Sequence, residues 1–86
     1  ENIDELEKKL EKNPENLDSL LEMAIALYGK GEIAKSFELL LNSIDIDREW
    51  NDQAARKQLL EFFTSAGFEA VETIDARRKL ASLLFS

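Results

Sequence analysis

Apolar residues recur at helical spacing in two neighbouring stretches between Asn13 and Ile46. Pro14 opens the region, and Gly31 interrupts the apolar pattern between the two stretches. The periodic positions are Leu17, Leu20, Leu21, Ala24, Leu27 and Tyr28, followed by Ile33, Phe37, Leu40, Leu41 and Ile44. Spacings of three and four residues place such side chains on one face of a helix. The pattern predicts a helix hairpin over residues 17–46, with a tight glycine turn at its centre.

The rest of the chain repeats this helical pattern in three further segments. They are marked by Ile3, Leu6 and Leu10; by Ala55, Leu59, Phe62, Phe63 and Ala66; and by Val71, Ile74, Leu80, Ala81 and Leu84. Asn16 is a candidate N-cap for the second helix, and Gly67 ends the fourth. Residues 45–51, including Trp50, are expected to connect the third and fourth helices. No stretch alternates with period two, so we predict an all-α fold of about five antiparallel helices.

A helix hairpin of about 34 residues is the unit of a tetratricopeptide array. In that pattern Ala24 is the small residue of close helix packing, and Ser36 stands where alanine is usual. Gly67 follows Gly31 by 36 residues, which predicts a second, degenerate capping hairpin over residues 51–85. Residues 3–12 then form the closing helix of a preceding repeat. We expect residues 1–86 to be one right-handed tetratricopeptide-like domain, and a fragment of a longer chain because it begins at Glu1.

Composition and charge narrow the classes of function. The 86 residues include neither His nor Cys, which removes the commonest general base, thiolate metal ligands and disulfides. The net charge of −7 disfavours nucleic acid and anionic membrane as partners. It is uneven, because residues 1–52 hold 14 acidic and 6 basic residues, whereas residues 53–86 hold 4 and 5. We expect no enzymatic activity, no cofactor and no metal site.

The acidic residues after the third helix do not form a calcium loop. Asp45, Asp47 and Glu49 alternate there, but Trp50 stands where an EF-hand needs glycine, and Arg56 where it needs glutamate. We therefore interpret these carboxylates as solvated or helix-capping groups.

Candidate partner-binding residues lie on two surfaces and at one isolated position. Leu21, Ile25 and Tyr28 map to the inner groove of the first hairpin, where apolar side chains favour an apolar segment over a carboxylate clamp. The alternative is that helix one or four covers them as core. Trp50 is either an exposed hot spot or a residue that packs across a helix junction.

The third candidate is the C-terminal tail. Leu83, Leu84 and Phe85 are consecutive, and consecutive helical positions cannot all face the core. At least one of them should therefore face solvent or a partner. The alternative is simple packing of the last helix on the fourth.

Two segments resemble one protein family. They are residues 48–60, which contain Trp50-Asn51-Asp52, and residues 76–86, which contain Leu83-Leu84-Phe85. Both resemble the C-terminal tetratricopeptide region of bacterial thioredoxin-like co-chaperones of the chaperedoxin (YbbN/CnoX) type. The resemblance implies a cytoplasmic holdase that works with the GroEL chaperonin and docks through its C-terminal end. The family's redox activity cannot be carried over, because this chain has no cysteine.

Two functions follow from these patterns. The first is a protein–protein interaction module of such a co-chaperone, which binds unfolded clients or chaperonin through apolar surfaces. The alternative is a structural or homodimerisation domain without client binding, since the unpaired first helix leaves an apolar flank.

Overall fold

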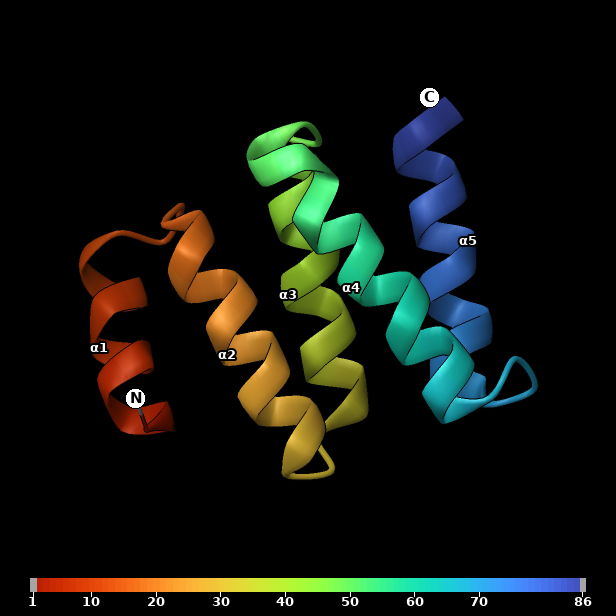
Figure 1. The fold of residues 1–86 in the computed structure, drawn as a ribbon, viewed down its shortest axis with the longest axis horizontal. Helices are drawn as coiled ribbons and strands as arrows, with labels where there is room; N and C mark the ends of the chain where they lie inside the picture. Colours follow the sequence, from red (N-terminus) through yellow and green to blue (C-terminus); the bar gives the residue numbers. More distant parts are fainter. Residues whose placement is uncertain (1, 86) are drawn as a thin grey trace.

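Five helices that alternate in direction make up the fold (Figure 1). The computed structural model describes residues 2–85; Glu1 and Ser86 lie outside the described residues. The helices are α1 (Ile3–Lys12), α2 (Leu17–Gly29), α3 (Ile33–Ile46), α4 (Trp50–Ala66) and α5 (Val71–Phe85). Residues 2–85 contain no strand, and none of their helices is both long enough and apolar enough to cross a bilayer. The predicted all-α fold is confirmed.

Asparagine side chains begin the first two helices. The Oδ1 atom of Asn16 accepts a hydrogen bond of 3.2 Å from the backbone N–H of Ser19. Asn2 caps α1 in the same way, with 2.8 Å to the N–H of Glu5. These side chains satisfy backbone donors that the first helical turn leaves free. The predicted N-cap at Asn16 is therefore confirmed.

Glycine closes both hairpin turns. Gly31 has φ of +92°, and the N–H of the next residue, Glu32, donates back to the carbonyl of Leu27 at 2.9 Å. This left-handed conformation favours glycine, because glycine has no Cβ that would crowd the adjacent backbone carbonyl. Gly67, with φ of +100°, ends α4 by donating to the carbonyl of Phe63 at 2.9 Å. Both predicted glycine turns are confirmed.

The connection between α3 and α4 is shorter than the predicted residues 45–51. Helix α3 continues to Ile46, and Trp50 belongs to the first turn of α4. The Oδ1 atom of Asp47 accepts from the N–H of Glu49 at 3.1 Å, which makes a tight turn of the kind that aspartate favours. Residues 51–53 then adopt left-handed backbone angles before the regular helix begins. Residues 47–49 thus form a compact turn between the two helices.

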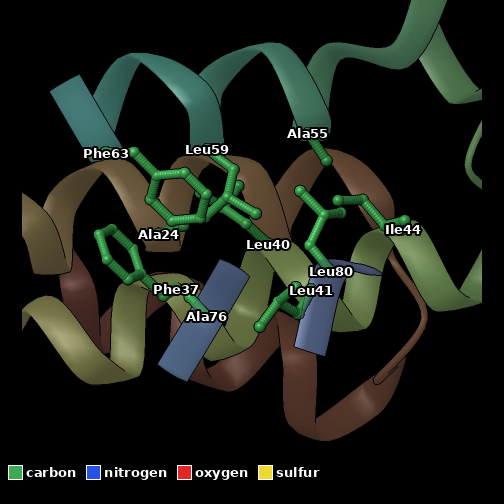
Figure 2. Close-up of a cluster of buried hydrophobic side chains, with 10 residues drawn as sticks. All are labelled: Ala24, Phe37, Leu40, Leu41, Ile44, Ala55, Leu59, Phe63, Ala76 and Leu80. Carbon is green, nitrogen blue, oxygen red and sulfur yellow. The ribbon is translucent and has the colours of Figure 1, made fainter. Parts of the chain in front are cut away.

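The main core is built around α3, which contacts α2, α4 and α5 (Figure 2). Its ten buried members are Ala24, Phe37, Leu40, Leu41, Ile44, Ala55, Leu59, Phe63, Ala76 and Leu80. The ring of Phe37 meets that of Phe63 edge to face, with centroids 5.2 Å apart. Helix α1 packs separately on α2, where Leu6 joins Met23 and Leu27 in a second cluster.

Helix α5 buries only part of the apolar stripe that the sequence marks, since Leu80 and Leu84 face the core but the other three residues do not. Val71, Ile74 and Ala81 lie exposed, whereas Thr73, Ala76 and Leu80 are buried. The buried positions follow those of Phe37, Leu40 and Ile44 in α3 at a constant offset of 36 residues. Helix α5 is therefore in register with α3 as a repeat, but its inward stripe is narrower and less apolar.

Candidate functional site

Small residues allow α2 and α3, the helices of the first hairpin, to pack closely. The hydroxyl of Ser36 on α3 donates to the carbonyl oxygen of Ala24 on α2 at 2.6 Å, and both residues are fully buried. Such a contact requires the two backbones to approach closely, which only short side chains permit. Ser36 therefore replaces the usual alanine and adds a hydrogen bond between the helices.

The second hairpin has large residues at the equivalent positions. With the offset of 36 residues, Leu60 on α4 corresponds to Ala24, and Glu72 on α5 corresponds to Ser36. Both Leu60 and Glu72 are exposed. Helix α5 makes its main contacts with α3 rather than with α4. Figure 1 shows α4 and α5 joined at the turn that follows Ala66 and separated toward their other ends. The sequence therefore explains why this hairpin is splayed.

A groove of about 320 Å³ lies between α4 and α5. We call it the α4–α5 groove. It is lined by Arg56, Leu60 and Phe63 on α4, Phe68 in the turn, and Arg77, Leu80, Ala81, Leu84 and Phe85 on α5. Leu60, Phe68 and Phe85 are three of the six large apolar side chains that the described residues expose. An apolar concavity with few polar groups is the usual form of a binding site.

Two arginines stand in this groove without a carboxylate partner among residues 2–85. The guanidinium of Arg77 lies 5.7 Å from the centroid of the Phe68 ring, a cation–π contact. Arg56 donates a long hydrogen bond of 3.4 Å to Gln53, while its Nε atom is buried with no acceptor among the described residues.

Arg48 ties the last turn of α5 to the α3–α4 connection. Its guanidinium donates to the carbonyl oxygen of Leu83 at 3.0 Å. A cation at this place suits the free carbonyls at a helix C-terminus. The contact links the C-terminal end of α5 to the turn that precedes α4.

The predicted inner groove of the first hairpin is mostly covered. The ring of Tyr28 stacks flat on that of Phe62 of α4, with centroids 3.9 Å apart, and Leu21 is half-buried against the main core. Ile25 is 45% exposed and lies beside α1, in a depression that it shares with Leu6. The structure therefore does not bring these three side chains onto one open surface.

The tail residues divide between two sides of α5. Leu83 and Leu84 are half-buried against the main core, whereas Phe85 is 85% exposed. This confirms that one of the three consecutive residues faces solvent. Leu83 borders a groove toward α3, while Leu84 and Phe85 border the α4–α5 groove. Trp50 is half-buried at the start of α4 and belongs to neither groove.

Sequence reasoning missed Leu60, Phe68, Arg56 and Arg77 as surface residues of one groove. The signal was present in the repeat, because bulky residues at positions 60 and 72 predict that the second hairpin cannot close as the first does. Among residues 2–85, no three His, Cys, Asp or Glu side chains are placed to hold a metal ion. What the arrangement offers chemically is apolar surface and two guanidinium groups.

Three comparisons with known proteins address the family to which the chain belongs. A comparison with curated proteins finds no match, and a comparison with solved structures finds none either. The tetratricopeptide repeat family matches residues 1–85, which is almost the whole chain. The alternating helices, the glycine turns and the close packing at Ala24 and Ser36 agree with this match. The chain therefore belongs to the tetratricopeptide repeat family.

Proposed function

We propose that this domain binds apolar segments of partner proteins in the α4–α5 groove. A tetratricopeptide repeat domain is a protein–protein interaction module, and protein partners follow from the family in general. The observation that carries the choice of surface is the gathering of Leu60, Phe68 and Phe85 around one concavity. Exposed apolar side chains that cluster mark interaction sites, whereas isolated ones need no explanation.

The proposed partner class is that of a co-chaperone: unfolded clients or the GroEL chaperonin. Its support is the resemblance of residues 48–60 and 76–86 to the helical region of thioredoxin-like co-chaperones. Residues from both segments, Arg56, Leu60, Leu84 and Phe85, line the same groove. In that setting the domain would work in the cytoplasm. The proposed activity is binding without catalysis, because no His or Cys is available to act as a base or nucleophile.

The test compares two side chains of equal exposure on different surfaces. Leu60 and Ile25 are both 45% exposed, but only Leu60 lines the α4–α5 groove. Binding of GroEL, and suppression of aggregation of a model unfolded client, are measured for Leu60→Ser, Ile25→Ser and Phe85→Ser. Circular dichroism checks the helicity of each variant. Point substitutions are preferable to removal of the tail, because Leu83 and Leu84 also support the core.

We expect Leu60→Ser and Phe85→Ser to weaken binding and Ile25→Ser to leave it unchanged. Loss of binding in Ile25→Ser alone would move the site to the α1–α2 side. Absence of GroEL binding and of client protection in the unmodified chain would reject the co-chaperone role. A dimer in sedimentation that Leu60→Ser dissociates would instead support the homodimerisation alternative.

A further inference from the structure

The α4–α5 groove differs in charge from four other depressions on this acidic molecule. Two grooves beside α3 and α5 include Glu38, joined by Asp45 in one and by Glu72 and Asp75 in the other. Those nearer the N-terminus include Glu22, or Asp4 with Glu7. The α4–α5 groove has no carboxylate in its walls and two arginines. Its local charge is thus opposite in sign to the net charge of −7.

We propose that the occupant of this groove is an acidic, apolar segment of a partner protein, whose carboxylates pair with Arg56 and Arg77. This inference rests on the proposed function, since it requires that the groove binds protein, and it adds the chemistry of the segment. Arginine presents a planar fork of donors that matches a carboxylate, and it retains this fork while its flat face lies on an aromatic ring.

The positions of the two guanidinium groups suit this partner. Arg77 lies over the exposed ring of Phe68, so an apolar side chain that contacts Phe68 brings a neighbouring carboxylate within reach of Arg77. Arg56 also lines the groove, and its one hydrogen bond within residues 2–85 is the long one of 3.4 Å to Gln53. The apolar walls between the two arginines take the apolar side chains of the segment.

A second copy of the chain fits less well. Each copy carries a net charge of −7, so the copies repel one another at long range. The net charge of the molecule also repels an acidic segment at long range and attracts a basic one. The overall charge therefore predicts a preference for basic segments, whereas the groove predicts a preference for acidic ones. The sign of the measured preference decides between these predictions.

The experiment uses three synthetic peptides that share the same Phe and Leu positions and carry Glu, Gln or Lys at the positions between them. Affinities for the 86-residue chain are measured by isothermal titration calorimetry at low and high salt. The chain variants are Leu60→Ser, Arg77→Gln and Arg78→Gln. Arg78 is the matched control, because it is exposed on the same helix but does not line the groove.

We expect the Glu peptide to bind most tightly and the Lys peptide least. Arg77→Gln should weaken binding of the Glu peptide about fivefold, as for a well-placed exposed ion pair, and leave the Gln peptide unchanged. Arg78→Gln should have no such effect, and added salt should reduce the preference for Glu.

Three results would overturn the inference. They are equal binding of the Glu and Gln peptides, tightest binding of the Lys peptide, and equal effects of Arg77→Gln and Arg78→Gln. If the Gln peptide binds and Leu60→Ser abolishes its binding, the proposed function stands while the acidic preference fails. If no peptide binds in a way that depends on Leu60, the proposed function fails as well.

Discussion

Ser36 shows how one small side chain determines the distance between two helices. Its hydroxyl touches the backbone of α2 at Ala24, and the residue has no exposed surface. A larger side chain at this position must push α3 away from α2, and the core around α3 moves with it. The opposite choice at Leu60 and Glu72 leaves the second hairpin open.

Substitution of Ser36 by leucine should therefore lower the free energy of unfolding by about 1–3 kcal/mol, the usual cost of overpacking. Ser65→Leu on α4, which is exposed, is the matched control and should change stability little. Urea denaturation followed by circular dichroism measures both. Equal midpoints for the two variants would contradict the close contact between α2 and α3.

Asp52 provides a prediction about pH. Its carboxylate accepts a hydrogen bond of 2.9 Å from the ammonium of Lys57, and this bond, together with the charge of Lys57, lowers the pKa of Asp52 below the ordinary 3.8. A lowered pKa in the folded state stabilises the fold above the unfolded pKa. That contribution is lost as the pH falls through the folded pKa.

The Asp52 carboxyl is fully exposed, so its effect on stability should be small. An NMR titration of side-chain carboxyl carbons should show Asp52 titrating below the ordinary aspartate value. Lys57→Gln should return the pKa of Asp52 toward that value. An unchanged pKa in the variant would rule out Lys57 as the cause.

At the scale of helices, two glycines near the end of α2 differ in whether their backbone conformation requires glycine. Gly29 is the last helical residue, and a Cβ there would meet nothing within 4 Å. Gly31 also has open space, but its φ of +92° strains any other residue. Gly29→Ala should raise the free energy of unfolding by roughly 0.5–1 kcal/mol, because alanine loses less backbone entropy in a helix.

Gly31→Ala should lower the same free energy by about 1–2 kcal/mol, because the left-handed conformation is unfavourable for alanine. Thermal unfolding of both variants measures the difference in sign. Because the two substitutions add the same methyl group two residues apart, a change of equal sign in both would show that the turn is not closed as described.

The same scale shows what the sequence can and cannot predict. Apolar spacing and glycine positions predict the five helices and both turns, because these features depend on neighbours in the chain. The inward face of α5 was not predictable from Val71 and Ile74, since burial there depends on contact with α3 and not on apolarity. The α4–α5 groove was missed for the same reason: it forms because α4 and α5 both pack mainly on α3 rather than on each other.

For the whole molecule, stability should decrease away from α3. This helix contacts three others, whereas α1 is held by one fully buried residue, Leu6, against α2. Native-state hydrogen exchange should therefore show the highest protection in α3 and the amides facing it, and markedly lower protection in α1. Local opening follows the density of buried contacts.

A matched pair of variants tests this gradient. Leu6→Ala should accelerate exchange in α1 with little change in α3, whereas Leu40→Ala should accelerate exchange everywhere, because it creates a cavity in the shared core. Uniform loss of protection in both variants would mean that the five helices unfold as one unit.

The two walls of the α4–α5 groove rest on the same third helix. Helix α4 is positioned through Leu59 and Phe63, and α5 through Ala76 and Leu80, all of them in the core around α3 (Figure 2). A substitution that changes the core volume of α3 therefore alters the width of the groove by shifting Phe63 and Leu80, although no residue in the walls is itself substituted. Related domains can therefore change the partner that they bind through conservative apolar substitutions in the core, at positions that the partner does not contact.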